Sequence, residues 1–420
     1  MIATVSGTLR GKVEVPSSKS VAHRMLICAA LSGTPCTIKC HSINRDMEAT
    51  ADCLNALGAN ITYADGEFSV KPITQVIRNA SLDCGESGST LRFMLPVAAA
   101  LGADATFLGH GRLPERPLSP LYEEMTAHGI QMSANGHMPL TCRGTLPAGT
   151  YTIDGGVSSQ FISGLLMALP LTGGESRIII TGKMESASYI GLTLNALAAF
   201  GIKVVRTDDG FLIPGGQKFT TPSEVTIEGD WSGAAFWLVA GTASSDAICC
   251  DGVDWSESAQ GDRRIVDILR LMGANIETGQ GYVIAYPAPL KAARIDCADV
   301  PDLVPVLAVA ASKAEGTTVF ENTRRLRIKE SDRIESVLTL LHAAGIEASA
   351  TENTLSVTGG KGHDCTCNPA GDHRMAMSAA VLASVHECVV RIEDAECTAK
   401  SYPDFWTHCS LMGGKLRIEN

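Results

Sequence analysis

The chain contains 420 residues, with 34 Lys or Arg against 45 Asp or Glu, so its formal net charge is −11. This acidic balance argues against a nucleic acid or an anionic membrane surface as the partner. Hydrophobic residues make up 45% of the chain, enough for a sizeable core. The longest apolar run, residues 303–311, is far shorter than the roughly 20 residues that cross a bilayer, so we expect a globular protein.

The first residues lack both a basic segment and an apolar segment, which argues against a secretory signal and predicts a cytoplasmic protein. Fourteen scattered cysteines without any Cys-x-x-Cys predict reduced thiols. The clusters at 36–41 and 363–367 lack the paired spacing of a zinc site. No phosphate-binding Walker loop and no dinucleotide fingerprint is present. The sequence therefore predicts neither a metal nor a cofactor.

A repeat of about 70 residues divides the chain into six units. Helix-like segments end at a glycine that precedes a short strand, and these glycines are Gly58, Gly129, Gly201, Gly273, Gly345 and Gly413. A glycine just past a helix is a common left-handed C-cap. Predicted helix starts recur with the same period, near Ser18, Gly88, Ser158, Asp230, Asp302 and Asp372. Each unit reads strand, helix, strand, helix, strand, strand, with strands such as 176–180 and 317–320.

This pattern predicts an α/β fold built by repetition. The first helix of each unit starts with Ser-rich residues in units one to three and with Asp in units four to six. The two halves therefore differ chemically, and we expect two domains of three units each, with a boundary near residues 227–230.

Three motifs of the first half place polar residues at helix starts. At residues 16–24, Lys19 and Ser20 open a capped helix and Arg24 lies one turn below Ser20, an arrangement suited to an anion. Residues 83–92 and 154–161 repeat the design in units two and three. A capped helix with solvated charges would explain each motif alone. Three such motifs at the same position of successive repeats favour a ligand site. Arg116 stands between two prolines, which restrict its backbone.

The second half adds cations and possible proton carriers. Residues 324–333 contain five cations and two carboxylates. A solvated helix start is the usual explanation, yet in an acidic chain this cluster also suits a polyanionic ligand. Asp302 heads an apolar helix, either as an N-cap or as a general base. The residues alone predict transfer chemistry on phosphorylated or carboxylated metabolites, with Asp302, Glu330 and His373 able to move protons.

These motifs resemble the 3-phosphoshikimate 1-carboxyvinyltransferase family, also called 5-enolpyruvylshikimate-3-phosphate (EPSP) synthases, over the whole chain. The most specific matches are Ser18-Lys19-Ser20 with Arg24, Ser158-Ser159-Gln160, and the segments 326–333, 372–376 and 400–404. The resemblance implies two similar domains, each of three β-α-β-α-β-β units, with a cleft between them. Residues 1–16 and 229–420 would form domain I, and residues 17–228 would form domain II.

The resemblance also implies the reaction: the enolpyruvyl group of phosphoenolpyruvate moves to the 5-hydroxyl of shikimate 3-phosphate through a tetrahedral intermediate, in the shikimate pathway. The implied contacts of shikimate 3-phosphate are Lys19, Ser20, Arg24, Ser158, Ser159, Gln160, Ser186, Tyr189, Asp302, Arg325 and Lys329. The implied contacts of phosphoenolpyruvate are Lys19, Gly88, Arg116, Gln160, Arg333, Arg374 and Lys400. Asp302 would be the base on the hydroxyl. Either Glu330 or a lysine, with Lys19 nearby, would protonate the methylene.

Two alternatives stay open at this point. The UDP-N-acetylglucosamine 1-carboxyvinyltransferases share the fold and chemistry, but they carry a Cys in a loop where residues 109–116 have none. The other alternative is a non-catalytic repeat protein that holds a polyanion. The chain is acidic and its cations are confined to short motifs, which argues against this alternative. We expect a monomer whose partners are its small-molecule substrates.

Overall fold

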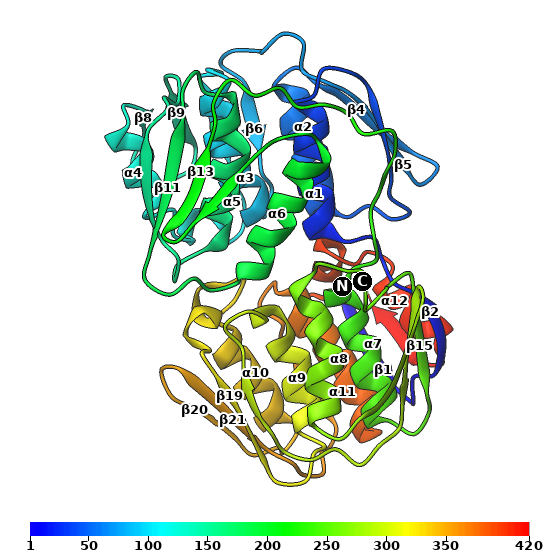
Figure 1. Ribbon diagram of the computed structural model, residues 1–420. Coiled ribbons are helices and arrows are strands. Elements are labelled where there is room, and N and C mark those ends of the chain that lie inside the picture. The colour runs from blue at the N-terminus through cyan, green and yellow to red at the C-terminus, as the bar shows by residue number, and fades with distance from the viewer. Residues whose placement is uncertain (420) are drawn as a thin grey trace. The chain divides into compact units, whose positions relative to one another are not determined.

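The structure is a computed structural model that describes residues 1–419. Its contacts divide the chain into two compact units: unit 1 comprises Met1–Pro16 with Glu228–Asn420, and unit 2 comprises Ser17–Ile227. Each unit has its own hydrophobic core and three four-stranded sheets (Figure 1).

In unit 2 the sheet orders are β14-β3-β5-β4, β6-β7-β9-β8 and β10-β11-β13-β12. The helices are α1 (Lys19–Ala30), α2 (Arg45–Ala56), α3 (Gly88–Ala100), α4 (Leu121–Ala127), α5 (Ser159–Ala168) and α6 (Ala187–Ala199). The strands are β3 (Cys36–Lys39), β4 (Asn60–Ala64), β5 (Glu67–Lys71), β6 (Ser81–Asp83), β7 (Thr106–Leu108), β8 (Gln131–Met132), β9 (Leu140–Arg143), β10 (Thr150–Asp154), β11 (Ser176–Thr181), β12 (Val205–Thr207), β13 (Gly210–Ile213) and β14 (Val225–Thr226).

In unit 1 the sheet orders are β16-β17-β15-β2, β18-β19-β21-β20 and β22-β23-β1-β24. The helices are α7 (Trp231–Ala243), α8 (Ile265–Leu271), α9 (Val304–Ala311), α10 (Arg333–Ala343), α11 (His373–His386) and α12 (Phe405–Leu411). The strands are β1 (Ile2–Ser6), β2 (Gly11–Glu14), β15 (Ile248–Asp251), β16 (Asn275–Gly279), β17 (Tyr282–Tyr286), β18 (Arg294–Asp296), β19 (Thr317–Glu321), β20 (Ala348–Ala350), β21 (Thr354–Thr358), β22 (Cys365–Cys367), β23 (Val390–Ile392) and β24 (Lys415–Glu419).

The predicted repeat is confirmed. All six of the repeat glycines have positive φ, between +76° and +111°, as left-handed C-caps require. In a typical sheet the first two strands are parallel, as in β18 and β19, and the other pairings are antiparallel, as in β19 with β21. Repeats one to five thus follow the predicted β-α-β-α-β-β order along the chain, and the sixth repeat ends in the single strand β24, with β1 completing its sheet.

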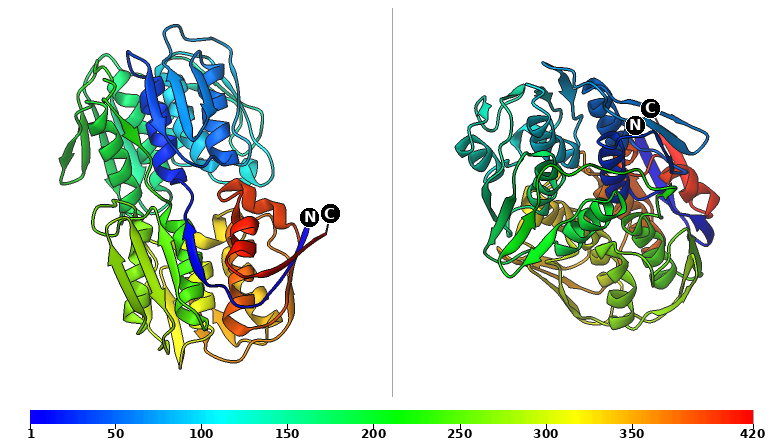
Figure 2. Two further views of the ribbon diagram at one scale, coloured as in Figure 1. Left: turned by 90° about the vertical axis from the view of Figure 1, so that its right-hand side faces the viewer. Right: turned by 45° about the horizontal axis from the view of Figure 1, so that its top comes forward.

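Three repeats take one strand from a distant part of the chain. The N-terminal strands join sheets of unit 1, since β2 runs parallel to β15 and β1 lies between β23 and β24. Figure 2 shows the blue N-terminal strand beside the red C-terminal one. The first strand of repeat one is instead supplied by β14, which runs parallel to β3.

Helices form the interior of each unit. In unit 1, α7, α9 and α11 pack against one another, and every residue of α9 and α11 is buried. Helices that are apolar on all sides belong in an interior. The strands alternate buried and exposed residues, as in β5 and β19, so the sheets form the outer layer. Among the helices of residues 1–419, none is both long enough and apolar enough to span a membrane.

Candidate active site

The candidate residues named from the sequence fall into two sets, one in each unit. The set of unit 2 comprises Lys19, Ser20, Arg24, Gly88, Arg116, Ser158, Ser159, Gln160, Ser186 and Tyr189. The set of unit 1 comprises Asp302, Arg325, Lys329, Glu330, Arg333, Arg374 and Lys400.

Three helices of unit 2 begin at candidate residues. Serine hydroxyls cap each of them: Ser18 accepts from an amide of α1, Ser87 from an amide of α3, and Ser158 from an amide of α5. Lys19, Gly88 and Ser159 are therefore the first helical residues. The remaining amides of a helix N-terminus and the helix dipole together favour an anion.

Arg24 is a buried cation whose three hydrogen bonds go to neutral oxygens. Its Nη1 donates to the carbonyl of Ser20 at 2.6 Å, its Nε to the hydroxyl of Thr193 at 2.7 Å, and its Nη2 to the carbonyl of Tyr189 at 3.0 Å. Burial lowers the pKa of Arg24 to about 10. The bonds to Tyr189 and Thr193 join α1 to the first two turns of α6.

Lys19 pairs with a carboxylate that the sequence analysis did not single out. Its Nζ lies 2.9 Å from Oδ2 of Asp46, which is 5% exposed at the start of α2. An acidic residue in a first helical turn is ordinarily explained by the helix dipole, so the sequence carried no distinguishing signal. Below Lys19, the buried His23 imidazole contacts the Thr50 hydroxyl at 2.7 Å.

Arg116 lies against Gly88. Arg116 follows the 3₁₀ turn Leu113–Glu115, and a Cβ atom added to Gly88 would come within 2.7 Å of its guanidinium. Only a residue without a side chain allows this approach. The structure thus brings a candidate cation to the amide end of α3.

Gln160 is held from two sides. Its Oε1 accepts from Nη1 of Arg92 at 2.6 Å, and its Nε2 donates to the Ser89 hydroxyl at 2.9 Å. The sequence analysis ended the second motif at Arg92 but gave this residue no role, because a lone Arg within an apolar helix has no local partner to reveal its role.

Ser186 is the N-cap of α6 and has a φ of 55°. For a residue other than glycine this left-handed conformation costs on the order of 1–3 kcal/mol, and such residues concentrate at functional sites. Ser186 precedes Tyr189, whose carbonyl accepts from Arg24.

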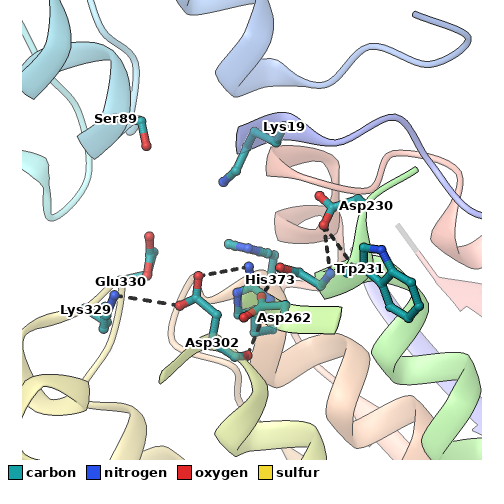
Figure 3. Close-up of polar contacts among 12 residues, drawn as sticks. Lys19, Ser89, Asp230, Trp231, Asp262, Asp302, Lys329, Glu330 and His373 are labelled. Atoms are coloured by element: carbon teal, nitrogen blue, oxygen red, sulfur yellow. Dashed lines mark hydrogen bonds and ion pairs between the residues drawn. The ribbon is translucent and has the colours of Figure 1, made fainter. Parts of the chain in front are cut away.

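In unit 1, Asp302 is surrounded by cations. Its Oδ1 lies 2.6 Å from Nη1 of Arg333 and 3.7 Å from Nζ of Lys329, and its Oδ2 lies 3.2 Å from Nη2 of Arg374. Figure 3 shows Lys329 directed at Asp302. Burial opposes ionisation, but the three cations outweigh it and hold the pKa of Asp302 well below its usual range. The N-cap alternative for Asp302 is therefore wrong, since this side chain binds cations rather than the amides of α9.

Arg333 joins three carboxylates. Besides Asp302, its Nη2 donates to Glu330 at 2.8 Å and its Nε donates to Asp372 at 2.7 Å. Arg333 is 1% exposed and Asp372 is fully buried, where it also caps α11. The sequence predicted Asp372 as a helix start but not as the partner of Arg333, which lies 39 residues earlier.

The remaining cations of this set lie around Lys329 and α11. Burial lowers the pKa of Lys329 to about 8, although Asp302 opposes the shift, and the nearby charge of Arg325 lowers it further. Lys400 is 7% exposed at the end of the 3₁₀ turn Ala395–Lys400, which packs on α11.

Asp262 is a second carboxyl that sequence reasoning missed. It is 3% exposed and accepts from the Ser232 hydroxyl near the start of α7. Burial, reinforced by the charge of Asp302, raises the pKa of Asp262 to about 7. Asp230 caps the same helix start, accepting from the Ser232 amide at 2.8 Å.

Within residues 1–419, no group of three or more His, Cys, Asp or Glu side chains is arranged to hold a metal ion. The cysteines have unpaired thiols, and most are buried. Burial raises the pKa of thiols such as those of Cys142 and Cys297 to about 12, which makes them poor nucleophiles.

Comparison with known proteins identifies relatives along the full chain. The family model described as EPSP synthase (3-phosphoshikimate 1-carboxyvinyltransferase) matches residues 3–409. The 3-phosphoshikimate 1-carboxyvinyltransferase of Clostridium kluyveri is 42% identical, over 97% of this chain and 96% of that protein. The Clostridium perfringens (strain 13) protein of the same name is 38% identical, over 98% of both. The solved EPSP synthase of Acinetobacter baumannii has a TM-score of 0.81 at 24% identity over both full chains, which shows the shared fold.

Proposed function

The chain belongs to the EPSP synthase family, whose enzymes transfer the enolpyruvyl group of phosphoenolpyruvate to shikimate 3-phosphate in the shikimate pathway, and we propose how its residues carry out that reaction. Both substrates carry a phosphate and a carboxylate, so the protein must neutralise four anionic groups. Fixed cations and helix amides do this without reorganising during the reaction. The observation that carries the proposed roles is the set of three ion pairs that Asp302 makes with Lys329, Arg333 and Arg374.

We propose that the set of unit 2 binds the substrate anions. Arg24, Ser20, Ser158, Ser159, Ser186 and Tyr189 would hold shikimate 3-phosphate, while Gly88 and Arg116 would hold phosphoenolpyruvate and Lys19 and Gln160 would contact both. The arrangement of Arg24 supports this role, because its hydrogen-bond partners are neutral and an anion would supply the missing counter-charge.

In unit 1, Asp302 would remove the proton of the 5-hydroxyl as its oxygen bonds to C2 of phosphoenolpyruvate. Cations hold the pKa of the substrate-free Asp302 low, which makes it a weak base. A phosphoenolpyruvate carboxylate bound by Arg333 and Arg374 would share their donors and so raise the basicity of Asp302. Lys329 and Arg325 would contact shikimate 3-phosphate, and Lys400 would complete the phosphoenolpyruvate contacts.

Glu330 would deliver the proton that the methylene carbon takes up in the same step, and Lys19 is the alternative donor. In the second step the C2–O bond to phosphate breaks and phosphate leaves, while the methyl group returns a proton to the carboxylate of the donor residue and the carbon–carbon double bond re-forms. The side chain of Glu330 is 14% exposed and is held by Arg333, which supports a fixed position for proton transfer.

Phosphate release from the purified protein tests the assignment. Phosphoenolpyruvate is supplied with shikimate 3-phosphate or with UDP-N-acetylglucosamine as the acceptor, in the presence of EDTA. We expect release with shikimate 3-phosphate alone. Release only with the nucleotide sugar would reassign the acceptor, and no release with either acceptor would favour the non-catalytic alternative.

We further propose that units 1 and 2 are the two domains of the family fold, and that the enzyme works as a monomer in the cytoplasm. The separate cores of the units support the first point. Size-exclusion chromatography with light scattering would test the second, since a monomer should give a mass near 44.2 kDa.

A further inference from the structure

Arg92 is a buried cation of unit 2 that the reaction as proposed does not use. It belongs to α3, is 4% exposed, and its guanidinium lies over the ring of Phe161 at 5.4 Å. Its Nη1 donates to Oε1 of Gln160 at 2.6 Å, and its Nη2 donates to the carbonyl of Pro117 at 3.0 Å. One guanidinium thus joins the start of α5 to the segment that carries Arg116.

The bond to Gln160 decides which end of the amide remains for a ligand. A guanidinium only donates hydrogen bonds, so it must face the amide oxygen and leaves the NH₂ group on the other side. That NH₂ group lies 2.9 Å from the Ser89 hydroxyl. An anion needs a donor, so the orientation imposed by Arg92 suits an anionic ligand, whereas the flipped amide would present an oxygen and repel it.

The bond to Pro117 acts on the neighbouring candidate residue. Pro117 directly follows Arg116, and a fixed carbonyl at Pro117 restrains the backbone from which the Arg116 side chain extends. The Arg116 guanidinium in turn lies against Gly88. A displacement of this backbone by about 1 Å would move the cation from its position at the start of α3.

We propose that Arg92 is a positioning residue for the phosphoenolpyruvate anion, acting by presenting the amide N–H of Gln160 and by holding the segment of Arg116. The proposal rests on the proposed function, in which Gln160 and Arg116 contact phosphoenolpyruvate. Arg92 itself does not touch the substrate. A lysine could not replace it, because a single ammonium group lacks the planar fork that reaches two acceptors at once.

The test is a double-mutant cycle of Arg92→Met and Gln160→Ala, read as kcat and as the separate KM values for the two substrates. We expect Arg92→Met to lower kcat/KM for phosphoenolpyruvate by about 10- to 100-fold, the range for a lost hydrogen bond to a charged group. The KM for phosphoenolpyruvate should rise more than that for shikimate 3-phosphate. The double variant should be less impaired than the sum of the two single effects, because Arg92 acts in part through Gln160, and it should be worse than Gln160→Ala alone, because Arg92 also holds the segment of Arg116.

Arg263→Met is the matched control, since the Arg263 guanidinium also lies over an aromatic ring, that of Trp255, and also donates to a backbone carbonyl. This control should keep kcat/KM within about twofold of the wild type. If Arg92→Met fails to fold, Arg92→Lys retains the charge and much of the packing, and it should still raise the KM for phosphoenolpyruvate.

Fully additive effects in the cycle, or an unchanged KM for phosphoenolpyruvate in Arg92→Lys, would overturn the proposal. A wild-type protein that releases no phosphate would instead refute the proposed function. The two failures are therefore distinguishable, since the cycle is measured only on an active wild type.

Discussion

Gly88→Ala should separate substrate binding from folding. Gly88 is the first residue of α3, so a methyl group there should leave the stability unchanged or raise it by up to about 1 kcal/mol through helix propensity. The new Cβ would lie 2.7 Å from Nη1 of Arg116. The guanidinium is the far end of a flexible side chain, so we expect it to retreat by roughly 0.7 Å to an ordinary contact distance rather than to disrupt the fold.

We propose that Arg116 binds phosphoenolpyruvate, so a displacement of that size is expected to lower kcat/KM for phosphoenolpyruvate by about 10- to 100-fold. Steady-state kinetics with each substrate varied in turn, together with thermal unfolding, measure both effects. The KM for shikimate 3-phosphate and the Tm should stay near the wild-type values. Ala98→Gly, at a buried site near the other end of α3, is the stability control. An unchanged KM for phosphoenolpyruvate would show that Arg116 does not bind this substrate from its present position.

Four further predictions concern Asp302, Lys19, His386 and the cysteines. Asp302→Asn should lower kcat by about 10² or more, because an amide cannot accept the hydroxyl proton; an unaltered kcat at saturating substrates would remove Asp302 from that role. Lys19→Met should abolish phosphoenolpyruvate binding in calorimetry, since it removes the cation and breaks the ion pair with the buried Asp46; native affinity for both substrates would contradict this. Burial lowers the pKa of His386 from 6.5 to about 4, so the unfolded chain takes up a proton first as the pH falls, and this group should remove about 2 kcal/mol from the free energy of unfolding between pH 7 and pH 5. Urea unfolding of His386→Gln should show a shallower pH dependence, and an identical slope would refute the assignment. A thiol reagent should modify at most the partly exposed cysteines of the native protein and all fourteen in denaturant; rapid native modification of more would contradict the burial. The partly exposed cysteines are Cys249, Cys365 and Cys397.

The sequence predicted the repeat because its signals are local. Gly58 and Gly129 stop helices through their own backbone conformation, and Ser18 and Ser158 cap helices through amides two or three residues away. Such signals recur in every unit and need no knowledge of distant parts of the chain. The use of strands from distant parts of the chain was not readable from these local signals, because β14 and β2 are short strands whose partners lie far away in sequence.

The partners of the buried cations were not predictable for the same reason. The bonded residues lie far apart in the sequence. The separation is 68 residues for Arg92 and Gln160, 27 for Lys19 and Asp46, and 39 for Arg333 and Asp372. Each partner has an ordinary local explanation, as a helix cap, a first-turn acid or a solvated charge. Only the packing of α1, α2, α3 and α5, and of α10 on α11, brings the pairs together. The sequence could therefore predict which residue types gather, but not which of them bind one another.

Charge compensation differs between the two sets. In unit 2 the hydrogen bonds of the buried Arg24 go to neutral oxygens, whereas in unit 1 the buried Arg333 binds three carboxylates. A substrate anion gains most beside a cation that lacks a counter-charge, so unit 2 is suited to hold the substrates. At Arg333 an anion must share donors with Asp302 and Glu330, which weakens binding there but frees the carboxylates to exchange protons. The candidate proton carriers with carboxyl groups all lie in unit 1. We therefore expect variants of Arg24 to act mainly on KM and variants of Asp302 and Glu330 to act mainly on kcat.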